Sequence, residues 1–230
     1  MRLLAIETSA RDAAVALTDH GVVSVLAVPR SGGRHAKELV PAIDRLLGEH
    51  SLAANGLEGI VVNLGPGSFT GLRVGVTVAQ TLGWLTGAAT VGVPLFVLLE
   101  AASGARSDRP RRLIANAERR ELFVADVAAG EQIASDVRIE PIDDALATDS
   151  ILVGTIPRSI CPSDWDRRDR MAFDAATLAK TLARLGQLAI ESGHAVPPAQ
   201  LLPIYGRRSA AEEMRDAGRR PKYEQVRPQS

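Results

Sequence analysis

The residues best able to do chemistry lie in one short segment, 65–75. It follows an apolar stretch at 59–64 and precedes a helical pattern, which predicts a turn from a buried strand into a helix. Ser68 or Thr70 can cap that helix, and backbone amides at such a turn can hold an anion. A plain capped turn, whose glycines only meet steric needs, remains the alternative. The loop residues are Gly65, Pro66, Gly67, Ser68, Phe69, Thr70, Gly71, Arg73 and Gly75.

This loop differs from two common nucleotide-binding motifs. A P-loop needs Gly-Lys followed by Ser or Thr, and no such tripeptide follows these glycines. The dinucleotide fingerprint has the pattern Gly-x-Gly-x-x-Gly, whereas Gly65, Gly67 and Gly71 are spaced two and four residues apart. The loop therefore belongs to neither class.

The rest of the sequence offers no ready catalytic pair or metal site. The four histidines stand at positions 20, 35, 50 and 194, so no His-x-x-x-His pair exists. The single cysteine, Cys161, excludes an internal disulfide framework and a Cys-rich zinc site. The segment 67–70 is not the Gly-x-Ser-x-Gly elbow of hydrolases. We therefore expect no catalytic residue and no metal ligands on this chain.

Composition narrows the class of protein further. Lys+Arg and Asp+Glu both number 27, which argues against a bulk electrostatic nucleic-acid binder. The two Trp, two Tyr and four Phe are scattered along the chain, which argues against a stacking platform for single strands. An early charge and the lack of a long apolar run argue against a signal peptide and a membrane span. We expect a soluble, cytoplasmic protein that contacts no membrane.

The order of elements in the first half predicts a fold. Three strands joined by tight turns, at 3–6, 13–17 and 22–28, are typical of an antiparallel meander. A helix, the strand at 59–64, a helix to about 86, a strand at 90–93 and a short helix follow. This α/β order is that of a ribonuclease-H-like fold, with a mixed sheet and helices on both faces.

The second half is less regular but has room for a reduced repeat of that fold. Apolar stretches at 112–115, 122–127 and 151–154 predict strands, and Asp174 can cap a helix that ends near Gly193. From Gly206 the chain is polar, with seven basic and four acidic residues. We predict a lobe over residues 1–103, a smaller second lobe over 104–205 and a mobile tail over 206–230.

The helix after the loop carries a small residue at every fourth position. Glycine inside a helix costs about 1 kcal/mol relative to alanine, so close approach of another backbone is the expected reason. Because a helix turns in about 3.6 residues, the stripe drifts around the axis and no single partner covers it. Its members are Gly67, Gly71, Gly75, Ala79, Gly83 and Gly87.

A second candidate turn follows the first strand, at Glu7, Thr8 and Ser9. In actin-like and sugar-kinase-like folds this place holds an Asp-x-Gly-Thr turn that contacts metal and phosphates. Here Glu7 replaces the aspartate, and Ser9-Ala10 stands where a glycine would help. We interpret it as a degenerate phosphate turn, with a solvated hairpin turn as the alternative for Glu7.

These segments together resemble the TsaB (YeaZ) family. The segment 65–75 after a buried strand is similar to the family signature, and Leu3-Leu4-Ala5-Ile6-Glu7-Thr8-Ser9 is similar to its first strand. The stretch 34–43 resembles its first helix, including Pro41. The resemblance thins beyond residue 103: Asn116, Glu118 and Gly206 depart from the family pattern.

The resemblance implies an actin-like ATPase (ASKHA) fold with two ribonuclease-H-like lobes, the second degenerate. It also implies a non-catalytic role in forming threonylcarbamoyl-adenosine next to the anticodon of tRNAs that read codons beginning with A. A paralogous TsaD-like transferase would be the catalytic partner and would hold ATP or ADP and a metal, with no cofactor on this chain. A TsaE-like ATPase would join them, and tRNA would be met through the complex.

Family members associate through the first two helices, so the resemblance also implies an interface. On this chain the helices carry two apolar stripes, and either could instead face the sheet. The same surface could form a homodimer. A small-metabolite kinase and a peptidase remain alternative functions, although the second half lacks a glycine-rich adenosine loop and no nucleophile–base pair is visible. The candidate interface residues are His35, Leu39, Ile43, Leu46, Val74, Val78 and Leu82.

Overall fold

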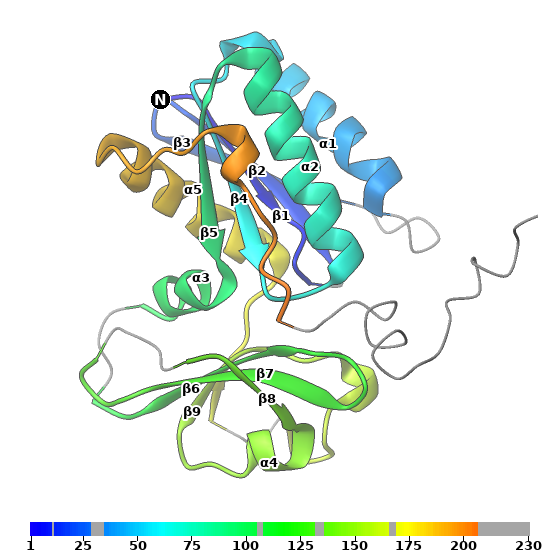
Figure 1. Ribbon diagram of the computed structural model, residues 1–230, viewed down its shortest axis with the longest axis vertical. Helices are drawn as coiled ribbons and strands as arrows, with labels where there is room; N and C mark the ends of the chain where they lie inside the picture. Colours follow the sequence, from blue (N-terminus) through cyan, green and yellow to red (C-terminus); the bar gives the residue numbers. More distant parts are fainter. Residues whose placement is uncertain (11, 29–34, 105–107, 132–135, 166–168, 207–230) are drawn as a thin grey trace, which may run out of the picture.

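The computed structural model describes residues 1–206, apart from residues 11, 29–34, 105–107, 132–135 and 166–168. Its described part forms two lobes, each built on a five-stranded mixed sheet (Figure 1). The predicted α/β fold is confirmed. The tail expected at 206–230 lies outside the described residues except for Gly206.

The first lobe follows the predicted order of elements closely. Its sheet has the order β3-β2-β1-β4-β5, in which β1 pairs antiparallel with β2 and parallel with β4. The predicted meander is therefore present, and two parallel strands extend it on the other side of β1. The elements are β1 (Leu3–Glu7), β2 (Ala13–Asp19), β3 (Val22–Val28), α1 (His35–Glu49), η1 (Ala54–Gly56), β4 (Gly59–Gly65), α2 (Phe69–Thr86), β5 (Ala89–Pro94) and α3 (Leu95–Ala102).

The second lobe repeats this topology in reduced form. Its sheet has the order β10-β9-β6-β7-β8, again a meander of three strands extended by two parallel strands beside the first of them. A five-residue helix and a three-residue 3₁₀ turn stand where the first lobe has long helices. The elements are β6 (Arg111–Asn116), β7 (Glu121–Val127), β8 (Arg138–Pro141), α4 (Ile142–Leu146), β9 (Ile151–Thr155), η2 (Arg158–Ile160) and β10 (Arg170–Met171).

Alternation along the strands divides the first lobe into two cores. On β1, Leu4 and Ile6 face the helices α1 and α2, whereas Leu3 and Ala5 face the other side of the sheet. Successive strand residues point to opposite faces, so a sheet that is buried on both sides needs apolar residues at every position. This explains why β1 reads as a continuous apolar stretch and not as an alternating one.

The helix α5 (Ala175–Glu191) corrects the predicted division into lobes. It was expected within the second lobe, at 104–205, but it packs on β1, β2, β4 and β5 of the first sheet. Its apolar stripe, which includes Leu178 and Leu182, joins the core on the side opposite α1 and α2. The chain therefore crosses into the second lobe after α3 and returns at α5, because the first sheet has a second apolar face to cover.

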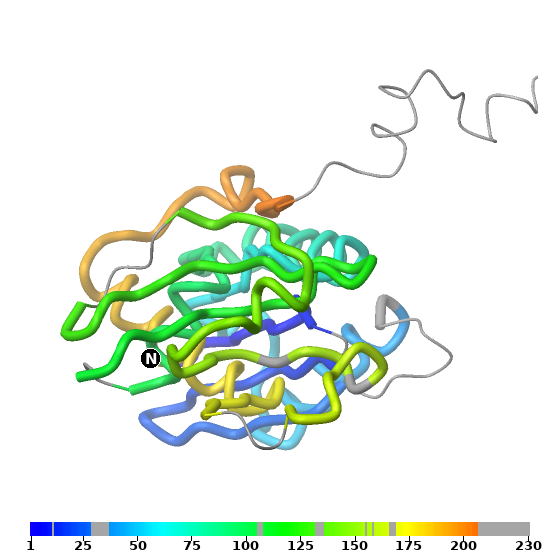
Figure 2. Tube along the Cα trace, turned by 90° about the horizontal axis from the view of Figure 1, so that it is seen from below, coloured from blue at the N-terminus to red at the C-terminus, as the bar shows by residue number. Residues whose placement is uncertain are grey.

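After α5 the chain runs back along α2 as an extended strap, residues 194–206, which includes η4 (Pro198–Gln200). The Val196 amide donates to the Thr90 carbonyl (2.8 Å), the Gln80 amide group donates to the Leu201 carbonyl (2.9 Å), and the Ile204 amide donates to the Leu64 carbonyl (2.7 Å). Viewed from the side of the second lobe, this orange segment lies along one side of both lobes (Figure 2). Among the described residues, no helix has the length and apolar character needed to cross a membrane.

The two lobes are joined by a buried ion pair as well as by apolar contacts. The Arg111 guanidinium of β6 is 1% exposed and lies 2.8 Å from the Glu100 carboxylate of α3. Burial raises the pKa of Glu100, and the neighbouring Arg111 opposes this rise. Arg111 also donates to the Ser103 hydroxyl and the Glu131 carbonyl, so its guanidinium is hydrogen-bonded to residues on both sides of the junction.

Candidate functional site

The turn after β1 packs directly against the beginning of α2. A Cβ atom added to Gly71 would overlap the carbonyl oxygen of Thr8, and one added to Gly67 would overlap the carbonyl oxygen of Ser9. A Cβ on Gly75 would meet the Thr8 hydroxyl. The predicted close approach of another backbone is therefore confirmed at Gly67 and Gly71, whereas Gly75 makes room for the Thr8 side chain.

The rest of the small-residue stripe meets different neighbours, as the drift around the axis predicts. Gly83 lies against Thr90 and Pro198, so it makes room for β5 and the strap. Gly87 caps the C-terminus of α2 in the left-handed conformation, with φ of 70°. The stripe therefore serves three separate purposes and does not form one continuous interface.

The N-terminus of α2 is closed by its own chain. The Ser68 hydroxyl accepts a hydrogen bond from the Gly71 amide (3.3 Å), which confirms Ser68 as the cap. The Ser68 amide donates to the Ser9 carbonyl (2.7 Å). Two amides that could hold an anion are thus already bonded, which favours the capped-turn interpretation of the loop.

Glu7 is fully buried, and its carboxylate is the centre of a polar network at the ends of β1 and β4. Oε1 accepts from the Ser9 amide (2.8 Å) and the Ser9 hydroxyl (2.6 Å). Oε2 accepts from Nδ2 of Asn63 (2.6 Å), whose Oδ1 in turn accepts from the Gly65 amide (2.8 Å). The alternative of a solvated hairpin turn is therefore wrong for Glu7. The burial of Glu7 could not be predicted from the sequence, because its partner Asn63 is 56 residues away.

Burial raises the pKa of Glu7 above its ordinary value of 4.5, and the hydrogen bonds from Ser9 and Asn63 only partly oppose this rise. A carboxyl whose pKa is higher in the folded state binds more protons there than in the unfolded chain. Its stabilising effect is complete below pH 4.5 and is lost as the pH rises through the folded-state pKa.

We expect Glu7→Gln to remove this pH dependence. The glutamine keeps an oxygen for Ser9 but loses the bond from Asn63, so the variant starts from a lower stability. The advantage of the wild type over the variant should shrink as the pH rises from 4.5 through the folded-state pKa, by at most about 1.4 kcal/mol per pH unit. Urea denaturation of both proteins at several pH values measures it. An advantage that grows with pH would mean that the hydrogen bonds outweigh burial.

The structure corrects one half of the predicted interface. Leu39, Ile43 and Leu46 of α1 are buried in the core beneath α1 and α2 and do not form a free stripe. Their positions match the stripe that any helix needs for packing on a sheet, so spacing alone could not distinguish the two. His35 begins α1, but its side chain lies outside the described residues.

The other predicted stripe lies at the edge of the core. Val74, Val78 and Leu82 are half-buried and pack against the core under α1 and α2. They lie on the flank of α2 opposite Gln80 and Gly83, which contact the strap. An open groove of about 380 Å³ runs over the exposed side of α2, lined by Phe69, Thr70, Arg73, Val74, Thr77 and Val78.

Sequence reasoning missed a contact between the first turn of α2 and the strap. Phe69, at the start of α2, packs on Tyr205 of the strap with ring centroids 4.8 Å apart. The Arg73 guanidinium lies over the Phe69 ring, 5.4 Å from its centre. Gly206 packs against the Phe123 ring of β7, so there the strap touches the second lobe. The departure from the family pattern at Gly206 makes room for this ring.

The described residues contain no group of three or more His, Cys, Asp and Glu side chains that could hold a metal ion. His50 bonds the Ser24 hydroxyl (2.8 Å) and thereby ties the end of α1 to β3. His20 stands 3.6 Å from the Asp19 carboxylate in the turn between β2 and β3. These contacts are local and connect neighbouring elements.

Comparison with known protein families gives one match over most of the chain. The family model described as "TsaD: tRNA N6-adenosine threonylcarbamoyltransferase" matches residues 17–155. This range includes most of the first sheet, all of α2 and the second sheet as far as β9.

Individual relatives carry a related but different description. The chain is 39% identical over 84 residues to the tRNA threonylcarbamoyladenosine biosynthesis protein TsaB of Bacillus subtilis, covering 36% of this chain and 37% of that protein. It is 31% identical over 136 residues to TsaB of Escherichia coli, covering 57% of each. The chain thus spans between about two fifths and three fifths of these curated relatives.

A solved structure matches over a greater length. A Pseudomonas aeruginosa protein, described as similar to the peptidase YeaZ, superimposes with a TM-score of 0.67 and 26% identity, covering 90% of this chain and 99% of that one. The similarity therefore extends over most of both lobes.

Proposed function

This chain belongs to the TsaB (YeaZ) group of the TsaD-like family, and we propose that it is the non-catalytic subunit that pairs with a TsaD-type transferase. In this proposal the complex forms threonylcarbamoyl-adenosine next to the anticodon of tRNAs that read codons beginning with A. A TsaE-type ATPase completes the complex, and the assembled complex binds tRNA. The modification takes place in the cytoplasm.

The observation that carries the non-catalytic role is the closed turn after β1. In the actin-like fold this turn contacts phosphates and metal, but here the Ser9 amide donates to the buried Glu7 carboxylate. The Thr8 carbonyl faces Gly71 of α2, and the Ser9 carbonyl faces Gly67 just before the helix and accepts from the Ser68 amide. The residues present do not fit a phosphate here, so we assign the nucleotide and the metal to the partner.

The positions of the histidines also support a non-catalytic role. A TsaD-like transferase holds its metal with a His-x-x-x-His pair, and the four histidines of this chain stand at positions 20, 35, 50 and 194. The match to the TsaD family model then reflects a shared fold and common descent. The partner would supply the chemistry, and this chain would support its active conformation.

We place the partner on the exposed side of α2 near α1. The groove there is lined mainly by apolar or small side chains, and Val74 and Val78 are half-buried at its wall. A facing helix that inserted its own apolar side chains would complete their burial, which is the usual composition of an interface core. In the absence of the transferase, a second copy of this chain could cover the same groove as a homodimer.

The purified chain should show no threonylcarbamoyl transfer to tRNA on its own, and its addition should raise the activity of the TsaD-type transferase. A reconstituted assay with a labelled, activated threonylcarbamoyl donor, the transferase, the ATPase and tRNA, run with and without this chain, measures both effects. Transfer by the chain alone, or a transferase that is indifferent to its presence, would contradict the proposal.

Two short controls address the other functions that the fold allows. ATP turnover by the isolated chain with candidate metabolites would support a kinase. Hydrolysis of a peptide library, sensitive to a chelator, would support the peptidase activity named for the similar Pseudomonas aeruginosa protein. We expect both assays to be negative.

A further inference from the structure

The strap creates a stacking surface that the scattered aromatic residues do not suggest. Phe69 and Tyr205 are 136 positions apart in the sequence, yet their rings lie 4.8 Å apart with planes tilted by 35°. The two residues remain 41% and 46% exposed, so each ring is also open to solvent. Arg73 adds a cation over the Phe69 ring.

The position of this pair is fixed from both lobes. The Ile204 amide donates to the Leu64 carbonyl immediately before Tyr205, and Gly206 rests on the Phe123 ring immediately after it. On the other side, Phe69 begins the first turn of α2 next to its Ser68 cap. The positions of the two rings are therefore fixed by contacts of the residues next to them in the chain.

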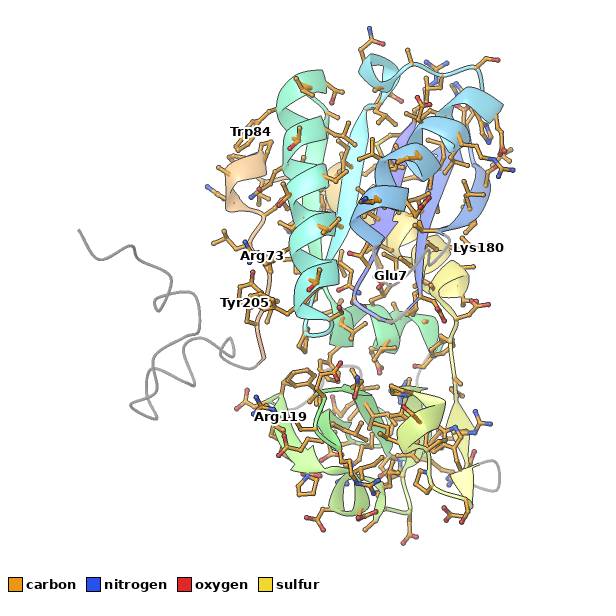
Figure 3. The ribbon with its side chains drawn as sticks, turned by 90° about the vertical axis from the view of Figure 1, so that its right-hand side faces the viewer. Glu7, Arg73, Trp84, Arg119, Lys180 and Tyr205 are labelled. Atoms are coloured by element: carbon orange, nitrogen blue, oxygen red, sulfur yellow. The ribbon has the colours of Figure 1, made fainter. Side chains whose placement is uncertain are left out.

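A turn of the second lobe that carries two arginine and two glutamate residues, over 118–121, lies on the same side of the molecule. Figure 3 shows Arg73, Tyr205 and Arg119 along one side, with Lys180 on the opposite side. Arg119 and Arg120 belong to the turn between β6 and β7, where Glu118, Arg119 and Arg120 all have positive φ, of 65°, 52° and 61°. The Glu118 carboxylate accepts a bond from the Asn116 side chain (3.1 Å).

Three consecutive non-glycine residues in the left-handed region are a strained arrangement, which persists only where other contacts hold it. Here the Ile142 amide donates to the Arg120 carbonyl (2.9 Å), and the Glu121 amide donates to the Glu118 carbonyl (2.9 Å). The turn presents two exposed arginine residues beside the end of the strap.

We propose that this stacking face, defined as Phe69, Arg73, Tyr205, Arg119 and Arg120, binds single-stranded RNA. An unpaired base would stack on the Phe69–Tyr205 pair, and phosphates would meet the two arginines of the turn. Aromatic stacking accepts any base because every base has a π face, and guanidinium groups pair well with phosphate. The inference rests on the proposed function, in which a tRNA with an unpaired anticodon loop is the substrate.

This face adjoins the proposed partner surface, because Phe69 and Arg73 also line the groove on α2, whereas Tyr205 and the turn of the second lobe do not. On α2, Phe69 and Arg73 stand towards the strap side, whereas Val74 and Val78 stand towards α1. A transferase bound over Val74 and Val78 would leave Tyr205 and the turn of the second lobe uncovered. RNA binding and partner binding can therefore be tested by different variants.

Fluorescence anisotropy with two labelled RNAs tests the proposal: a hairpin with an unpaired seven-nucleotide loop, and a blunt duplex of equal length. We expect the hairpin to bind more tightly. Tyr205→Ala should weaken hairpin binding about 5- to 150-fold, the range for loss of one stacked base, while Tyr205→Phe should stay within twofold of the wild type. Thermal melts followed by circular dichroism confirm that the variants are folded.

The arginine contribution is read from the salt dependence. Arg119→Gln should lower the slope of log K against log salt concentration by about 0.7, the value for one phosphate contact on a single strand. Lys180→Gln, on the opposite side of the molecule, removes an equal charge and should leave affinity and slope unchanged. Arg119 lies in an exposed turn, so this variant keeps the proposal falsifiable even if Tyr205→Ala loosens the strap.

The proposal is overturned if Tyr205→Ala and Arg119→Gln both bind the hairpin like the wild type. It is also overturned if the duplex binds as tightly as the hairpin. A third contrary result is that neither RNA binds the chain, alone or with the transferase. Gel filtration of each variant with the TsaD-type partner separates the two proposals. A complex that forms and stimulates transfer without these RNA effects refutes only the stacking face. Failure of the wild type to form a complex refutes the proposed function, whatever the RNA result.

Discussion

Replacing Gly71 by alanine is expected to destabilise this protein by about 1 kcal/mol net, although alanine is the better helix former. The added Cβ would overlap the Thr8 carbonyl oxygen, and a backbone atom cannot move aside as the end of a flexible side chain can. Overpacking of this kind costs about 1–3 kcal/mol, against a propensity gain of about 0.5–1 kcal/mol. Urea denaturation gives the free energy of unfolding, and Gly71→Val should lower it further.

Gly48 is the matched control for this substitution. It also lies within a helix, α1, but a Cβ there would meet nothing within 4 Å. Gly48→Ala should therefore raise the stability slightly, by up to about 1 kcal/mol. If Gly71→Ala raised the midpoint as Gly48→Ala does, the turn after β1 would have to be free to move away from α2, and the closed turn would no longer support a non-catalytic role.

A second large effect is expected on the binding of the TsaD-type transferase when Val78 is replaced. Val78→Arg should weaken binding to the TsaD-type transferase at least 30-fold, the loss of about 2 kcal/mol typical of a central interface residue. Val78 is half-buried at the groove on α2, so in the isolated chain a long arginine side chain can reach water and the fold should survive. Gel filtration with the transferase and circular dichroism of the isolated variant measure the two effects.

Two further variants show whether the surface is placed correctly. Ile43→Arg should unfold the chain or cost it several kcal/mol, because Ile43 is 4% exposed within the core and its replacement would bury an unpaired charge. Leu188→Arg, at an exposed position of α5 on the opposite face of the sheet, should change neither folding nor assembly. Loss of the complex with Leu188→Arg as well would show that the partner does not bind at α2.

The buried Glu7 network and the close contact of the turn with α2 share one cause. Parallel strands β1 and β4 end at the same edge of the sheet, so Glu7 and Asn63 become neighbours there. The turn that follows β1 must then pass over the beginning of α2, where the glycines give it space. A site that holds phosphate in related folds is here filled by the protein's own carboxylate, which is why we look to the partner for chemistry.

Local pattern alone was sufficient for much of this protein. The meander, the strand before the loop, the capped helix at Ser68 and the close approach at Gly71 follow from apolar runs, turn residues and glycine spacing. These features depend on neighbours within about one element along the chain, where propensity, capping and sterics act directly. The family motif at 65–75 is of the same kind.

Tertiary structure decided everything that depends on distant segments. A helical stripe does not say which surface it will cover, so Leu39, Ile43 and Leu46 were indistinguishable from interface residues until the sheet was placed beneath them. For the same reason α5 was predicted to belong to the second lobe, although it covers an apolar face of the first sheet. The burial of Glu7 and the pairing of Phe69 with Tyr205 required strands and a strap to meet across 56 and 136 positions, and only the folded chain brings such residues together.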